Sequence, residues 1–197
     1  MFRLNWIAFL VALLGITACD GPPGTVQADV VPVYDARTAQ LVRLDYDSNH
    51  DGLVDTRTYM QGTHVRRAES DTDRDGKVDR WEYFDTQGRQ VRVGGSSARD
   101  GLEDTWMSTE PATGLTRLDY STRRDRRIDR REFLSSGTLV RAEEDTNGDG
   151  LADKWETYDH GRLTEVALDT TYGAGRPDRR LIYGAGGELV RIEPVTR

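Results

Sequence analysis

The sequence predicts an all-β protein, a repetitive antiparallel meander of about six strand–loop–strand units whose sheet is curled or superhelical. Three observations support this fold class. An aspartate returns every 24 or 25 residues. Runs rich in β-branched and aromatic residues flank each of these positions, and a turn closed by glycine follows. The pattern does not decide between an open sheet and a closed one.

The repeat is anchored on the last aspartate of an acidic loop. This aspartate stands at intervals of 24, 25, 25, 24 and 25 residues. The six anchors are Asp55, Asp79, Asp104, Asp129, Asp153 and Asp178. A unit of this length has room for two short strands, one loop and one turn, so we expect about twelve or thirteen strands.

Each unit has one apolar run before its loop and a second run after it. Leu41–Arg43 and Arg80–Phe84 are examples. Because side chains alternate between the faces of a strand, Arg43 is expected on one face and its apolar neighbours on the other. Trp81, Trp106 and Trp155 recur at one place in the unit. A row of this kind is more often buried core than a carbohydrate platform, and both interpretations stay open here.

The acidic loops have the spacing of a cation site. In the second loop, Asp71, Asp73, Asp75 and Asp79 stand at positions one, three, five and nine, with Gly76 at six. Alternate carboxylates can converge on a hard cation, and the backbone carbonyl of Lys77 at position seven adds an oxygen. The fifth and first loops give Asp145, Asn147, Asp149, Leu151 and Asp153, and Asp47, Asn49, Asp51, Leu53 and Asp55.

Three further loops keep only part of this pattern. Ser96–Asp104 and Ser121–Asp129 lack several carboxylates, and residues 169–178 carry one extra residue and a proline. We expect their last aspartates to bond backbone amides. The alternative for the intact loops is an Asp-Gly turn without metal, but crowded carboxylates are unfavourable without a neutralising cation.

The intact loops resemble two families of calcium site. Loops two and five resemble EF-hand loops through position twelve, which is Glu82 or Glu156, and make these glutamates weaker candidate ligands. Two helices do not fit the short repeat. The nine-residue string also resembles the β-hairpin calcium loops of integrin alpha-chain propellers, where position nine completes the ligands. Segments such as Tyr158–Leu163 are similar to tyrosine-aspartate repeats of bacterial surface and toxin proteins.

A different role for the glutamates follows from the strand pattern. Glu82, Glu132 and Glu156 recur at one place in the unit and would lie near Arg66, Arg117 and Arg141 in a regular hairpin. Opposite charges facing each other across strands stabilise a sheet by about 0.2–1 kcal/mol per pair. Ligation and ion pairing are both kept open for Glu82 and Glu156.

The front of the chain is a targeting segment. Residues 1–18 hold one charge, Arg3, and an apolar core, as a secretory signal does. The residues Ile16–Cys19 resemble a bacterial lipobox, whose cysteine is lipidated, and Cys19 is the chain's single cysteine. We expect residues 19–38 to be a tether and residues 39–197 to be the calcium-loop β-repeat domain.

Together these features predict a calcium-binding, lipid-anchored cell-envelope protein with a structural or interaction role, on the periplasmic or surface side. The alternative is a polysaccharide- or protein-binding module that calcium stiffens; a calcium sensor ranks third. The net charge of −7 argues against a nucleic-acid partner. No nucleophile motif or phosphate-binding loop is found, so catalysis is not expected.

Overall fold

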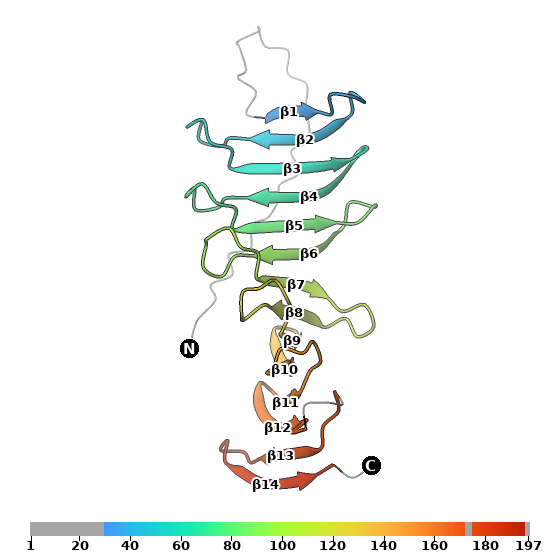
Figure 1. Ribbon diagram of the computed structural model, residues 1–197, viewed down its shortest axis with the longest axis vertical. Helices are drawn as coiled ribbons and strands as arrows, with labels where there is room; N and C mark the ends of the chain where they lie inside the picture. Colours follow the sequence, from blue (N-terminus) through green and yellow to red (C-terminus); the bar gives the residue numbers. More distant parts are fainter. Residues whose placement is uncertain (1–29, 172–174, 196–197) are drawn as a thin grey trace.

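The computed structural model describes residues 30–171 and 175–195, which form one antiparallel sheet of 14 strands in sequence order (Figure 1). The strands are β1 (Val30–Tyr34), β2 (Leu41–Tyr46), β3 (Thr56–Gln61), β4 (His64–Ser70), β5 (Arg80–Phe84), β6 (Gln90–Gly95), β7 (Thr105–Thr109), β8 (Thr116–Tyr120), β9 (Arg130–Ser135), β10 (Thr138–Glu144), β11 (Lys154–Asp159), β12 (Arg162–Leu168), β13 (Arg179–Tyr183) and β14 (Leu189–Pro194). No helix of the described residues is long and apolar enough to cross a membrane.

The predicted all-β meander is confirmed, and the sheet is open, with β1 and β14 at opposite ends. The sheet also starts earlier than residue 39, because Val30–Tyr34 forms a strand against β2. This strand lies ahead of the first acidic loop, so the repeat pattern did not reveal it. It raises the number of strands to 14.

Acidic loops and glycine turns lie on opposite edges of the sheet. In Figure 1 the loops after β2 and β4 lie on the left, whereas the described residues between β12 and β13 lie on the right. The acidic edge therefore winds around the long axis as the strands twist. Each strand of the described residues contacts only the strands next to it in sequence, as expected for a repeat protein.

Most of the hairpins at the glycine-turn edge of the sheet contain a β-bulge, and it lies at the same place in each unit. The pairing jumps from Tyr59–Arg67 to Met60–Val65, which leaves Arg66 as the extra residue. The expected Glu–Arg ladder is wrong because of the register across the acidic loops. Arg117 and Arg141 stand one residue before the partners of Glu132 and Glu156, so their side chains lie on the other face of the sheet. Glu82 lies opposite Ala68 instead, and its ion pair is with Arg80 of its own strand, 2.7 Å away.

The same correction holds for the other two glutamates. Glu132 pairs with Arg130 at 2.9 Å. Glu156 pairs with Lys154 at 2.8 Å and with Arg130 at 3.0 Å. Arg130 also reaches Glu144 at 3.1 Å, so these side chains form one ionic network over β9, β10 and β11.

Arginines cover the aromatic row on the opposite face. Trp81 and Trp106 are only 7% and 8% exposed, whereas Trp155, the third tryptophan of the row, is half-buried. Phe133, on the same face, is 4% exposed. The guanidinium carbon of Arg92 lies 4.8 Å from the ring centre of Trp106, and that of Arg141 lies 3.8 Å from Phe133. Long arginine stems therefore take the place of a second layer, and the aromatic rings are core, as the sequence favoured.

Candidate metal centre

Loop two is held between β4 and β5 by its first and last residues. Asp71 follows β4 directly and Asp79 precedes β5, where its N–H donates to the carbonyl of Ser70. Gly76 turns the chain with a φ of 88°, in the left-handed region that favours glycine. This turn directs the loop back toward its own start.

The carboxylate of Asp71 fixes the shape of the loop. Its Oδ1 accepts the N–H of Arg74 at 2.7 Å, and its Oδ2 accepts that of Gly76 at 2.7 Å. Position one does the same in the other intact loops. Asp47 accepts from His50 and Gly52, and Asp145 accepts from Gly148 and Gly150. The three loops therefore share one backbone design.

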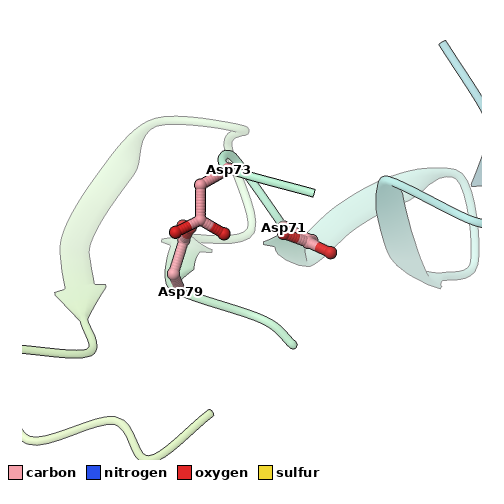
Figure 2. Close-up of side chains that lie close together, drawn as sticks. All are labelled: Asp71, Asp73 and Asp79. Carbon is pink, nitrogen blue, oxygen red and sulfur yellow. The ribbon is translucent and has the colours of Figure 1, made fainter. Parts of the chain in front are cut away.

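Loop two brings three carboxylates together. One oxygen from each of Asp71, Asp73 and Asp79 lies within 4.8 Å of the others, and the group is partly exposed (Figure 2). Three negative charges at this spacing repel one another unless a cation lies among them. The group can hold a metal ion, and its all-oxygen donors suit a hard cation.

The other two expected ligands of loop two, Asp75 and Lys77, are not in this close group of carboxylates. The Oδ1 of Asp75 accepts the N–H of Lys77 at 2.9 Å, and its Oδ2 lies 3.6 Å from the Lys77 ammonium. Lys77 was expected to act through its backbone carbonyl, and its side chain is exposed.

Loops one and five have asparagine at position three, which changes their internal bonds. The amide of Asn49 donates to Asp51, and that of Asn147 donates to Asp149. Position seven is Leu53 or Leu151, and both side chains are exposed. Among the described residues, three close carboxylates occur in loop two alone.

The aspartate at position nine has a structural partner that the ligand spacing alone does not indicate. In each of the six units the N–H of the residue at position two donates to the aspartate at position nine, and most of the hydroxyls donate as well. The pairs are Ser48 with Asp55, Thr72 with Asp79, Ser97 with Asp104, Thr122 with Asp129, Thr146 with Asp153 and Thr170 with Asp178. A Ser or Thr stands at position two in all six units, and that regularity could have revealed the contact.

The incomplete loops are closed without a full set of carboxylates. Asp104, Asp129 and Asp178 bond backbone amides, as predicted. In loop three, Arg124 from the next loop donates to Asp100 at 2.6 and 2.7 Å and to Asp104 at 3.0 Å. Hydrogen bonds from Arg124 lower the pKa of Asp100 to about 2.

Glu82 and Glu156 lie in the strands, where cationic side chains hold them. Arg80 and the Gln90 amide contact Glu82. Glu156 is 8% exposed and accepts from Arg130 and Tyr158. Burial tends to raise the pKa of Glu156, but the hydrogen bonds of Lys154 and Arg130 outweigh it and lower this pKa.

The segment that contains Cys19 lies outside the described residues. Comparisons of the chain with protein-family models and with curated proteins give no match. Its function is therefore argued from the repeat, the loops and the sheet.

Proposed function

We propose that this chain is a calcium-binding, lipid-anchored protein of the bacterial cell envelope, in which calcium stiffens the acidic edge of the sheet. The observation that carries the proposal is the close group of Asp71, Asp73 and Asp79. Loops one and five support it, since Asp47 and Asp145 make the same backbone bonds as Asp71.

Calcium is favoured over other metals by the donors. Every candidate ligand side chain is a carboxylate or an amide oxygen, with backbone carbonyls at position seven, and such sets suit Ca²⁺. Magnesium needs near-octahedral geometry and keeps several waters. A loop with partly exposed, adaptable carboxylates fits the larger ion better.

A structural role follows from the place of the sites. Each intact loop joins two neighbouring strands, so an ion there stabilises one hairpin of the sheet. Extracellular calcium modules bind with dissociation constants of about 10⁻⁴–10⁻³ M. At roughly ten times that constant, one site adds about 1.4 kcal/mol to the free energy of unfolding. Three sites would add about 4 kcal/mol, a large share of ordinary domain stability.

The anchor is proposed from the lipobox-like segment alone. Cys19 would carry the lipid and become the first residue of the mature chain, and the tether would begin there. The sheet would then lie beside the membrane on the periplasmic or surface side.

A groove favours the second candidate, a module that binds a polysaccharide or a protein. The groove has a volume of about 880 Å³ and follows one face of the sheet from β4 to β8. Val93, Met107 and Leu118 lie on facing positions along its floor, and Tyr120 and Arg124 line it as well. Calcium at loop two would hold the edge of this groove.

Thermal unfolding of the full chain tests the first candidate. Calcium at millimolar concentration should raise Tm relative to a chelated sample, and magnesium should raise it less. An equal Tm with and without calcium would contradict the proposal. A glycan array tests the second candidate independently, because it measures binding to glycans and not the effect of calcium on Tm.

A further inference from the structure

Arginines form a second series along the acidic edge. Position four is Arg74, Arg99 and Arg124 in loops two, three and four. All three have a left-handed backbone, with φ values of 63°, 52° and 58°. His50 and Gly148 take the equivalent places in loops one and five, with φ values of 59° and 85°. The left-handed turn therefore belongs to the loop itself, and in loops two, three and four the residue at this turn is an arginine.

Each of these arginines reaches back to the preceding loop. Arg74 Nη2 lies 3.3 Å from the hydroxyl oxygen of Ser48 in loop one. Arg99 Nη1 lies 3.3 Å from Asp73 Oδ2 in loop two. Arg124 contacts both Asp100 and Asp104 in loop three. The acidic loops are therefore linked to one another by guanidinium groups.

Loop three shows what such a contact achieves. Its position one is Ser96, and the two carboxylates at its ligand positions, Asp100 and Asp104, both bond Arg124. The guanidinium supplies one positive charge to these two carboxylates, so the chain itself provides part of the neutralising charge. Arg99 of loop three makes the corresponding contact to loop two, where it reaches Asp73, one carboxylate of the close group. The side chain of Arg99 is 72% exposed.

We propose that Arg99 is a built-in competitor of the metal ion in loop two and sets the affinity of that site. The inference rests on the proposed calcium function. A divalent ion among Asp71, Asp73 and Asp79 must share Asp73 with the guanidinium or displace it. By linkage, calcium in loop two then releases Arg99 and loosens the contact between loops two and three.

The size of the effect follows from exposure. Exposed ion pairs contribute little, so removing Arg99 should raise calcium affinity by about two- to fivefold. Screening by salt weakens a contact of this kind, and the gain should shrink at high ionic strength. Because Arg99 is exposed, its replacement should leave the sheet folded.

The test uses the full chain with Asp47→Asn and Asp145→Asn, which weaken loops one and five and leave loop two intact. Calcium is titrated calorimetrically into this parent, into its Arg99→Gln form and into its Arg89→Gln form. Arg89 pairs with Asp85 at the turn edge, so its loss changes net charge equally but far from the loop. The expected result is two- to fivefold tighter binding for Arg99→Gln and no change for Arg89→Gln.

Two outcomes overturn the inference in different ways. If all three forms bind calcium equally, or if Arg99→Gln binds more weakly, Arg99 is not a competitor and the calcium function still stands. If none of the three forms binds calcium and the unsubstituted chain does not bind it either, the result contradicts both the role of Arg99 as a competitor and the proposed calcium function. Circular dichroism of each form establishes that the sheet is intact.

Discussion

The hydroxyl of Thr72 donates to both carboxylate oxygens of Asp79, at 2.8 and 2.7 Å, and so closes loop two at the point where β5 begins. The same closure by position two recurs at Asp104 in loop three, where the close carboxylate group is missing. Position nine therefore stabilises the hairpin whether or not a metal binds. Its role as a ligand has to be separated from this structural role by experiment.

Asp79→Asn and Asp104→Asn form a matched pair for that purpose. Both weaken the closure of a loop, and each should lower the free energy of unfolding by about 1–3 kcal/mol without calcium. Only Asp79→Asn removes a charge from the proposed site, so it alone should also lose part of the calcium-dependent stabilisation. Denaturant unfolding with and without calcium measures both effects. Equal calcium increments in the two variants would show that Asp79 is not a ligand.

Glu82→Gln and Glu156→Gln test the ionic interpretation of the strand glutamates. Glu82 sits in an exposed pair, so its loss should cost about 0–1 kcal/mol. Glu156 is buried against two cations, so its loss should cost about 1–3 kcal/mol. The calcium increment should be unchanged in both variants. Loss of that increment would instead make position twelve a ligand.

The cost of Glu156→Gln should depend on pH. Because the pKa of Glu156 is lowered in the folded chain, its stabilising effect is complete above the unfolded pKa of about 4.3. The effect is lost as pH falls through the lower folded value. Wild type and variant should therefore differ fully at pH 7 and converge at low pH. A difference independent of pH would mean that packing, and not charge, explains the loss.

Among the described residues β1 and β14 each pair with one strand, and the proline in each should keep copies of the sheet apart. The N–H of Val195 points inward to Asp178, so by alternation the nitrogen of Pro194 points outward. Pro32 interrupts β1 at the other end. Proline removes a donor that an added strand needs. Pro32→Thr with Pro194→Tyr should increase self-association in sedimentation velocity runs. An unchanged distribution would show that other features block these edges.

Much of the fold follows from the sequence because the repeat is strong. The aspartates at position nine, from Asp55 to Asp178, located both strands of every unit. The bulges left no signal, since an extra residue such as Arg66 looks like any other strand residue. The ion partner of Glu82 could not be read from the spacing either, because the β4–β5 register places Ala68 opposite Glu82 and the partner, Arg80, lies on the same strand. The contacts of Arg99 and Arg124 with the preceding loops could not be predicted, because they depend on a left-handed backbone at these residues that sequence spacing does not encode.

The anchor is tested by Cys19→Ser. If Cys19 carries the lipid, cells should accumulate unprocessed precursor, and labelling with a fatty-acid analogue should disappear. Processing and labelling that continue in the variant would rule out the lipobox interpretation.

Calorimetric titration of calcium into the chelated full chain tests the central claim most directly. We expect binding of about three ions with dissociation constants near 10⁻⁴–10⁻³ M, and markedly weaker binding of magnesium. Tm should rise over the same range of calcium concentration. A chain that takes up no calcium at millimolar concentration, while circular dichroism shows an intact sheet, would contradict the account.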